Sequence, residues 1–437
     1  MGDKGSGWKA AWAAGRLAAR RVVGRAAGAA DRELGERLAA ELDQMKGLGM
    51  KLGQIVSYMD VPLPAEAQAA LAKLQQGNFA LPPEEFRAAL EAGLRSVGVE
   101  SIEAALVDLG AEPVAAASIG EVHRARLRAP TGAPEAFDEV AVKVRYPGVE
   151  NRFEGDLAGV RRMASLARFV STVDGEALVR ELGERLTIEC DYGSEATWQA
   201  AFRDFFAGDD DLKIPRIVGS LSSVGVLISE WVEAQTFDAF RATAEVGERR
   251  RIAEAMVRFG YRSMLVAFAI QADPHPGNFL IRSREGGPQL VCLDFGCVRE
   301  LPRDMAEATR AQTEALWRGD EPAFRAASEA MGLIGTAKRF DYDHLWRQYR
   351  HMFAPFLRED FVFDEAYAKD TLRYNGPTNP NARKLGIPAP YMWIARLQWG
   401  LWAVVKRLEV EGGYGEVLEE ILAETPKPLS RPDGTSI

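Results

Sequence analysis

The amino-acid sequence predicts an α+β protein with three successive parts: a helical N-terminal extension, a lobe rich in strands and a lobe rich in helices. Three observations lead to this prediction. Apolar residues recur three and four positions apart from about residue 7 to residue 94, the spacing of amphipathic helices. Short β-branched runs bounded by glycine and proline, such as "DEVAVKVRYPGV", come next and indicate a small antiparallel sheet. After Phe237, helical periodicity dominates as far as Glu424.

These changes in pattern set the predicted domain bounds. Residues 1–96 form the extension, and residues 97–235 form the strand-rich lobe with a helical insert between Val149 and Phe206. Within that lobe, "PRIVGSLSSVGVLISEWVEA" predicts two further strands. Residues 236–425 form the helix-rich lobe, and the proline-containing residues 426–437 form a flexible tail.

Composition limits the classes of function. The chain has 437 residues, 47% of them apolar and 27% charged, with a formal net charge of −9. These values are typical of a globular protein and give no general attraction to nucleic acid, so no nucleic-acid partner is expected. Cys190, Cys292 and Cys297 lack metal-ligand spacing and the density of a disulfide scaffold. We therefore expect buried thiols in a reducing compartment.

The N-terminal sequence predicts a cytoplasmic protein. Arginines, among them Arg16 and Arg20, interrupt the only stretch resembling a signal peptide, and no apolar run is long enough to cross a bilayer. Basic residues and Trp8 and Trp12 at helical intervals favour a helix packed on the protein, with peripheral contact at the inner face of the membrane as the alternative. The aromatic segment "YMWIARLQWGLWAVVKRL" likewise favours core packing over a lipid-binding stripe.

Lys143 is the first candidate site residue. It lies in "VAVKV", where strand alternation places Val142 and Val144 on one face and the lysine on the other. A lysine facing a cleft can hold nucleotide phosphates. Taken alone, a solvent-exposed lysine on an edge strand is the simpler interpretation.

Asp273 and Asn278 are the next candidates, in the turn "QADPHPGNFLI". Pro274 and Pro276 restrict the backbone, so that Asn278 is expected to return toward Asp273. An aspartate that accepts or orients the proton of an attacking hydroxyl, with a metal-binding asparagine five residues later, is typical of kinase-like phosphoryl transfer. A capped turn with two local hydrogen bonds is the alternative.

Asp294 completes the set, at the end of the apolar run "LVCLDFG". A carboxylate at a strand end can bind magnesium between phosphate oxygens, whereas an Asp-x-Gly turn is the structural alternative. The order of strand lysine, D-x-x-x-x-N and strand DFG is far more specific than any single motif. It predicts a kinase-like site for adenine nucleotide.

Two segments refine this prediction. The helix predicted in "ELGERLTIECDYGSEATWQAAF" offers Glu189, Asp191 and Glu195 as partners for Lys143, with Asp191 and Glu195 on one face at a spacing of i and i+4. A solvated acidic helix is the alternative. The loop expected to cover the phosphates has alanines where kinases have glycines. Nucleotide binding is therefore expected to differ from that of a protein kinase.

With these motifs in hand, the sequence resembles the UbiB/AarF-domain family of atypical kinase-like proteins. The resemblance rests on "MKLGQ" (the KxGQ motif), "AAASIGEVHRA", "VAVK", "ECDYGSEA" (the ExD motif), "ADPHPGN" and "LDFG". It implies a two-lobed protein-kinase-like fold with a helical N-terminal KxGQ extension. It also implies ATP or ADP and Mg²⁺ as cofactors, and links to ubiquinone or other isoprenoid-lipid metabolism.

The resemblance implies a role for each site residue. Asp273 and Lys143 are catalytic, with Lys143 on the phosphates, and Asn278 and Asp294 hold magnesium. Nucleotide binding further involves Ala115, Ala116, Ala117 and Ser118 in the loop, and Glu230 and Val232 at the hinge. Glu195 pairs with Lys143, while Lys51 or Gln54 meets Glu189 or Asp191 and covers the groove where a protein kinase binds peptide.

The predicted function is a slow ATPase or a phosphotransferase acting on a small molecule or lipid. The alternative is a nucleotide-switched protein that binds or presents an isoprenoid lipid without productive phosphotransfer. A third hypothesis, an ordinary small-molecule kinase, is disfavoured because Gln271 stands where such kinases have a histidine two residues before the aspartate. The sequence gives no oligomeric state.

Overall fold

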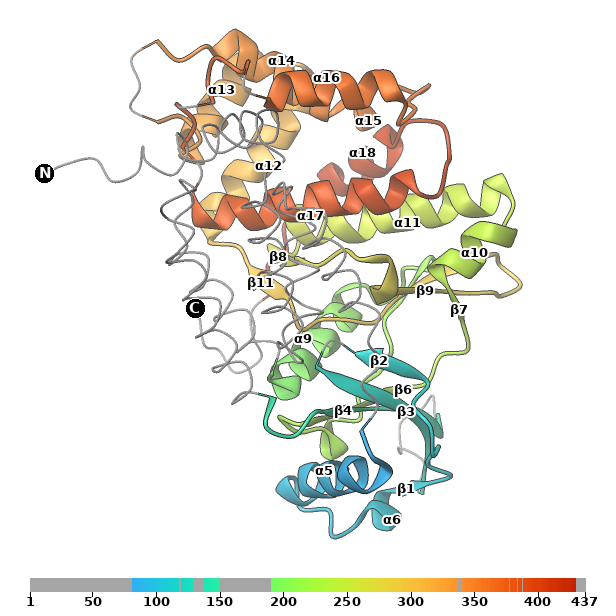
Figure 1. Cartoon of the computed structure of the whole chain (residues 1–437). Helices are drawn as coiled ribbons and strands as arrows, with labels where there is room; N and C mark the ends of the chain where they lie inside the picture. Colours follow the sequence, from blue (N-terminus) through green and yellow to red (C-terminus); the bar gives the residue numbers. More distant parts are fainter. Residues whose placement is uncertain are drawn as a thin grey trace, which may run out of the picture. The chain divides into compact units, whose positions relative to one another are not determined.

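The structure is a computed structural model that describes residues 81–117, 119–128, 137–149, 190–335, 339–376, 378–382, 384–386 and 388–429 (Figure 1). The predicted helices before residue 81, together with Lys51, Gln54, Ser118 and Glu189, lie outside the described residues. The chain divides into two compact units. Unit 1 comprises the described residues up to Ser194 and Ile217–Trp231, and unit 2 comprises Glu195–Arg216 and the described residues from Val232.

Unit 1 is built on an antiparallel sheet with the strand order β1-β3-β4-β6. Strand β2 pairs with the first three residues of β3, on the edge of β3 that does not pair with β4. The strands are β1 (Leu106–Val107), β2 (Ala115–Ala117), β3 (Gly120–Leu127), β4 (Glu139–Arg145) and β6 (Val226–Glu230). Helix α5 (Pro83–Ser96) buries Phe86, Leu90 and Leu94 in one apolar cluster with the valines of β4. The short helix α6 (Ile102–Ala105) leads into β1. The small antiparallel sheet predicted from the β-branched runs is therefore present.

The prediction of two strands between residues 215 and 234 is wrong in one part. Only β6 forms there, and the residues before it make the 3₁₀ turn η1 (Gly219–Leu221) and a single bridge between Ile217 and Ser229. The Ser222 hydroxyl donates to the carbonyl of Val218 at 3.0 Å and accepts from the amide of Ile228 at 3.1 Å. Serine bonds of this kind satisfy the backbone locally and compete with a strand.

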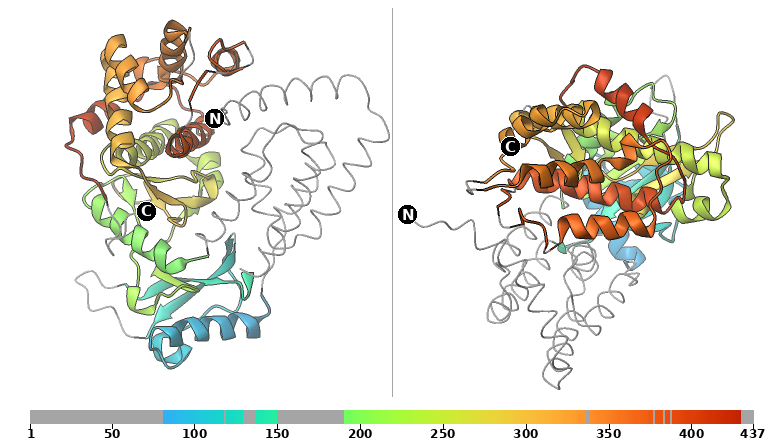
Figure 2. Two further views of the ribbon diagram at one scale, coloured as in Figure 1. Left: turned by 90° about the vertical axis from the view of Figure 1, so that its left-hand side faces the viewer. Right: turned by 90° about the horizontal axis from the view of Figure 1, so that it is seen from above.

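Unit 2 is mainly helical, as the periodicity predicted. Its long helix α11 (Val246–Leu265) is buried along most of its length and packs against α12, α17 and α18 (Figures 1 and 2). The helices of this unit are α10 (Phe237–Thr243), α11, α12 (Arg303–Arg318), α13 (Glu321–Ala330), α14 (Tyr342–Met352), α15 (Ala354–Leu357), α16 (Glu365–Asn375), α17 (Ala389–Lys406) and α18 (Gly415–Ala423). Helix α9 (Tyr192–Phe205) begins in unit 1 and continues in unit 2.

Two small sheets complete unit 2. One has the order β5-β10-β9-β7, from β5 (Leu212–Lys213), β7 (Gln235–Thr236), β9 (Phe279–Arg282) and β10 (Gln289–Cys292). The other pairs β8 (Ala269–Gln271) with β11 (Val298–Glu300). The 3₁₀ turn η2 (Pro276–Asn278) lies in the connection between β8 and β9. The strand predicted in "PQLVCLDFG" is β10.

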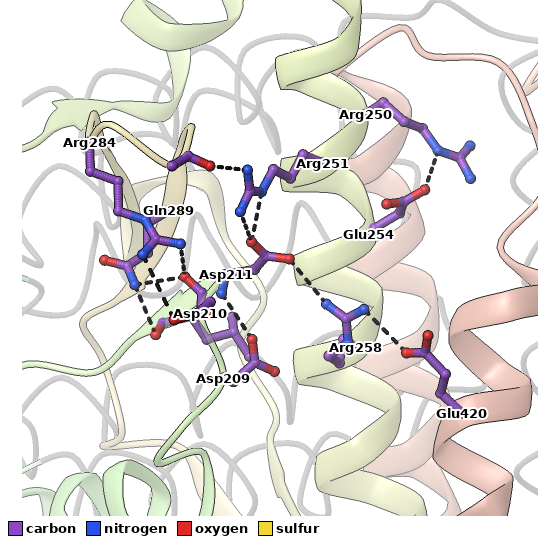
Figure 3. A network of polar contacts seen from close by, with 12 residues as sticks. Asp209, Asp210, Asp211, Arg250, Arg251, Glu254, Arg258, Arg284, Gln289 and Glu420 are labelled. Atoms are coloured by element: carbon purple, nitrogen blue, oxygen red, sulfur yellow. Dashed lines mark hydrogen bonds and ion pairs between the residues drawn. The ribbon is translucent and has the colours of Figure 1, made fainter.

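A polar network fixes the first of these sheets to the helices of unit 2 (Figure 3). Asp211, just before β5, accepts hydrogen bonds and ion pairs from two arginines of α11, Arg251 at 2.7 Å and Arg258 at 3.5 Å. Arg258 also contacts Glu420 of α18 at 3.3 Å. Because the same carboxylate bonds two turns of α11, the network sets the position of β5 along this helix.

The expected burial of the cysteines is confirmed. Cys190, Cys292 and Cys297 are all buried. Burial raises the pKa of the Cys292 thiol well above its usual value, so this group stays protonated and unreactive near neutral pH. Among the helices of the described ranges, none combines the length and the apolar character needed to cross a bilayer.

Candidate nucleotide site

Lys143 occupies the face of β4 opposite the core, as strand alternation predicted. Val142 and Val144 are fully buried on one face, and Lys143 is half-buried on the other. Its Nζ lies 4.6 Å from the centre of the Tyr192 ring, in a cation–π contact. The contact gives the ammonium group a defined position within unit 1, which a solvated edge lysine would lack.

The alanine-rich segment forms strand β2 and pairs with β3, with Ala115 opposite Val122 and Ala117 opposite Gly120. Gly120 has no space for a side chain: a Cβ there would lie 2.2 Å from the Val144 carbonyl oxygen and 2.7 Å from the Tyr192 hydroxyl. Gly120, the first residue of β3, therefore lies directly against β4. The alanines belong to an ordinary strand pair, which requires no positive φ.

The hinge segment continues from β6. Glu230 pairs with Val140 of β4, and the amide of Trp231 donates to the Glu139 carbonyl at 2.9 Å. The chain passes from unit 1 to unit 2 between Trp231 and Val232. Both predicted hinge residues are half-buried. Glu230 lies just before Trp231, and Val232 is the first residue after the crossing.

The acidic helix differs from the prediction. Asp191 does not lie within α9 but immediately before it, where its Oδ1 accepts hydrogen bonds from the amides of Gly193 and Ser194 at 3.0 and 3.1 Å. An aspartate that satisfies the first amides of a helix starts that helix. The expected shared face of Asp191 and Glu195 is therefore wrong, because the helix begins one residue after Asp191.

Glu195 is placed in the first turn of α9 and is 3% exposed. Its Oε2 lies 3.6 Å from the position that a Cβ on Gly296 would occupy. The carboxylate of Glu195 is thus beside the Asp294-Phe295-Gly296 segment, within unit 2. Burial of an acidic side chain at this point indicates a structural or functional requirement, since glutamate is rarely buried.

The turn after β8 holds Asp273 by its backbone. Two side chains donate to its carbonyl oxygen, Nε2 of Gln271 at 3.0 Å and Nδ2 of Asn278 at 2.9 Å. The Asp273 amide donates in turn to Oε1 of Gln271 at 3.3 Å. The buried Gln271 side chain therefore holds the Asp273 backbone in place. It stands at the position where small-molecule kinases have a histidine.

His275 supports the same turn. Its Nδ1 accepts a hydrogen bond from the amide of Gly277 at 3.0 Å. This is the hydrogen-bonding role that the two flanking prolines favour, because they leave the backbone few alternatives.

Asp294 is joined to this turn through the backbone. Its Oδ1 accepts from the amide of Gly296 at 2.9 Å, and the amide of Leu293, one residue earlier, donates to the Asn278 carbonyl at 3.1 Å. Asn278 and Asp294 thus lie on adjacent backbone segments. Because the Asn278 amide nitrogen is bonded to Asp273, its oxygen is the atom suited to a cation. One carboxylate and one amide oxygen fit magnesium, which takes few protein ligands and completes its shell with phosphate oxygens and water.

A residue that the sequence did not reveal completes the site. Nη2 of Arg396, from α17, lies 2.6 Å from Oδ1 of Asp273, and both side chains are largely buried, with exposed fractions of 22% and 16%. The predicted aromatic helix indeed packs in the core, where Leu397 and Leu401 are buried. Its arginine, however, reaches the candidate catalytic aspartate. The only available signal was a cation within an otherwise aromatic helix.

The same helix touches the turn a second time. A Cβ on Gly400 would lie 2.6 Å from Cγ of Pro274. Gly400 and Arg396 are four residues apart and so lie on one face of α17. This face of α17 therefore determines where the Asp273 turn lies.

Comparison with known proteins decides the family. A family model described as the ABC1 atypical kinase-like domain matches residues 74–327, more than half of the chain. The chain belongs to the ABC1 atypical kinase-like family. This confirms the resemblance drawn from the motifs, since UbiB and AarF proteins are members of that group.

Individual ABC1 relatives agree. The atypical kinase coq-8 of Caenorhabditis elegans is 28% identical over 68% of this chain and 38% of its own length. The probable protein kinase UbiB of Xanthomonas oryzae pv. oryzae is 29% identical over 62% of this chain and 49% of its own. These matches span less than half the length of either relative.

A solved structure confirms the protein-kinase-like fold. The complex of Rv3197 with erythromycin, from Mycobacterium tuberculosis, superposes with a TM-score of 0.64 at 25% identity, over 91% of this chain and 97% of that one. Lys143, Asp273 and Asp294 lie inside the ABC1 match, whereas Arg396 lies beyond its end.

Proposed function

We propose that this ABC1 protein binds ATP or ADP with Mg²⁺ and slowly hydrolyses the γ-phosphate or transfers it to a small molecule or lipid, in ubiquinone or other isoprenoid-lipid metabolism. One observation carries the proposal: the carbonyl of Asp273, the side chain of Asn278 and the backbone before Asp294 are joined by hydrogen bonds. Three oxygen-bearing side chains are thereby gathered on two short segments, an arrangement that suits phosphoryl transfer.

The proposed chemistry assigns one task to each group. The Asp273 carboxylate takes the proton of the attacking water or hydroxyl as that oxygen bonds to the γ-phosphorus and the bond to the β-phosphate oxygen breaks. Asn278 and Asp294 would hold magnesium, which would neutralise charge on the phosphates. Lys143 would contact the phosphates, and Glu195 would pair with Lys143.

The ion pair with Arg396 is a reason to expect slow turnover. One carboxylate oxygen of Asp273 is occupied by the guanidinium at 2.6 Å. A carboxylate held by an arginine is a weaker proton acceptor than an unpaired one. We infer that the resting protein must loosen this contact before Asp273 acts as a base.

The first experiment measures magnesium-dependent ATP turnover by the wild type and Asp273→Asn, with and without liposomes that carry a polyprenyl quinone precursor. We expect Asp273→Asn to lower turnover by about a hundredfold or more, because proton transfer by a placed side chain contributes roughly 10²–10⁴-fold. Asp343→Asn, at an exposed position of α14, is the matched control. Equal turnover by Asp273→Asn and wild type would falsify the catalytic assignment.

A second candidate function is a nucleotide-switched protein that binds or presents an isoprenoid lipid. The solved relative described as an erythromycin complex favours it, because a protein of the same fold is described with a bound small molecule that is not a nucleotide. Here the affinity for lipid should differ between ATP-bound and nucleotide-free protein, even where turnover is negligible. Equal lipid binding in both states would exclude this candidate.

A further inference from the structure

Unit 2 contains a cavity of about 400 Å³ that is separate from the residues assigned to nucleotide. Helices α12, α14, α16 and α17, labelled in Figure 1, contribute side chains that line it. Small-molecule sites commonly have volumes of roughly 300–1,000 Å³ and mostly apolar walls. The size of this cavity is therefore sufficient for a ligand rather than for a few waters.

On the α12 side of the cavity, the polar side chains already have hydrogen-bond partners in the protein. The hydroxyls of Thr309 and Thr313 donate to backbone carbonyls of their own helix at 2.7 and 2.8 Å, and the amide of Gln312 donates to Ser328 at 2.9 Å. These side chains consequently present methyl and methylene groups to the cavity. Aromatic rings, among them Tyr367 and Trp402, form much of the remaining wall.

A pair of tyrosines places a polar group in the cavity wall. The hydroxyls of Tyr349 and Tyr391, both lining the cavity, are 2.6 Å apart. In such a pair one hydroxyl donates and the other accepts, so the accepting tyrosine keeps a hydrogen of its own to donate. Burial raises the pKa of both hydroxyls, and the pair stays neutral at physiological pH. An oxygen atom of a neutral ligand can accept this hydrogen bond.

The exposed residues that line the cavity include the charged Asp364 and Lys406 as well as large apolar side chains. Trp399 and Leu372 line it and are 46% and 64% exposed. Large apolar side chains exposed together at a concave site are typical of ligand-binding surfaces.

We propose that this cavity binds an elongated, mostly apolar small molecule that carries a single hydroxyl or carbonyl group. The hydrocarbon body lies among the aromatic rings, and the oxygen accepts from the Tyr349–Tyr391 pair. The proposal goes beyond the nucleotide chemistry and does not depend on it, since every lining group belongs to unit 2 and none is assigned to phosphoryl transfer.

Equilibrium dialysis of full-length protein with labelled farnesol, an isoprenoid alcohol, tests the proposal without nucleotide. Ala368 of α16 lines the cavity, whereas Ala366, exposed on the same helix, does not. Ala368→Trp should fill the cavity and weaken binding by about tenfold or more, while Ala366→Trp should bind as the wild type does. Farnesene, the hydrocarbon without the hydroxyl, should bind more weakly than farnesol.

Three results would overturn the proposal: no saturable binding to the wild type, equal binding by both tryptophan variants, or equal binding of farnesol and farnesene. Far-ultraviolet circular dichroism of Ala368→Trp confirms that the variant is folded. A protein that binds farnesol but does not turn over ATP would leave this inference intact and refute only the proposed enzyme.

Discussion

At the scale of single residues, the pairing of Asp273 with Arg396 governs what the site can do. The Arg396 and Asp273 side chains are only 22% and 16% exposed, so solvent screens their ion pair less than an exposed pair, which is worth about 0.2–1 kcal/mol. The contact therefore holds Asp273 in place, and breaking it costs free energy.

Arg396→Gln should therefore raise the turnover number for ATP by about fivefold or more, because about 1 kcal/mol, the upper value for exposed ion pairs, corresponds to a factor of about five. Arg347→Gln, exposed on α14, should have no effect. Steady-state kinetics at saturating ATP gives the result. A decrease would instead show that Arg396 orients Asp273 and that the ion pair is needed during catalysis.

His351 makes stability depend on pH. Burial lowers its pKa, partly offset by the charge of Asp370. Between this lowered pKa and the usual value, the unfolded chain binds the proton more readily than the folded chain, so the contribution of His351 to stability is lost as pH falls. His351→Gln should reduce the loss of unfolding free energy between about pH 7 and pH 5, since the usual pKa of histidine is about 6.5.

Urea denaturation of wild type and His351→Gln at several pH values provides the measurement. Carboxylates titrate in both proteins, and the difference between the two profiles isolates the histidine. Parallel profiles would contradict the prediction.

Residue by residue, the sequence predicted what local chemistry determines. Lys143, Asp273, Asn278 and Asp294 are recognisable because each lies in a short motif with a fixed spacing. Arg396 was missed because it lies 123 residues from its partner, and no local pattern encodes that contact. The hydrogen bonds from the Gln271 side chain to the Asp273 backbone were missed for another reason. The sequence showed only that Gln271 stands where small-molecule kinases have a histidine.

At the scale of elements, α17 positions the Asp273 turn through Gly400. Because a Cβ there would lie 2.6 Å from Pro274, Gly400→Ala should displace the turn, lower ATP turnover by about tenfold and cost about 1–3 kcal/mol of stability, the usual cost of overpacking. The matched control is Gly247→Ala in α11, where nothing lies within 4 Å of the added Cβ. Alanine favours helix formation more at the interior Gly400 than at Gly247 in the first turn, so a loss of stability in Gly400→Ala alone comes from the contact with Pro274.

Turnover assays and thermal unfolding of the two alanine variants make the comparison. If Gly400→Ala behaves like Gly247→Ala in both, the turn tolerates movement and α17 does not control it.

Element boundaries show where sequence reasoning fails. The alternation in "VAVKV" predicted β4, because one buried and one half-buried face require a period of two. The acidic helix was predicted to start too early, since Asp191 caps α9 and the cap is set by two amide hydrogen bonds. The second strand near residue 220 was overpredicted because serine hydrogen bonds closed a turn there.

At the scale of the whole molecule, the order of a strand-rich unit and a helix-rich unit followed from periodicity alone. The division in space was not predictable in the same way. Residues 195–216 fall within the predicted first lobe but belong to unit 2, because α9 and β5 pack with the helices and strands that come later. The domain bounds drawn from composition remain predictions.

The interleaving of the two units fixes the order in which the newly made chain can fold. Strand β6, which pairs with β4, leaves the ribosome only after Glu195–Arg216 of the other unit. The sheet that carries Lys143 can close at that moment, before Asp273 has left the ribosome. Until the later helices of unit 2 have also left the ribosome, the apolar residues of α9 that pack against them stay exposed. Exposed apolar surface of this kind favours aggregation, so the nascent protein depends most on chaperones at this stage.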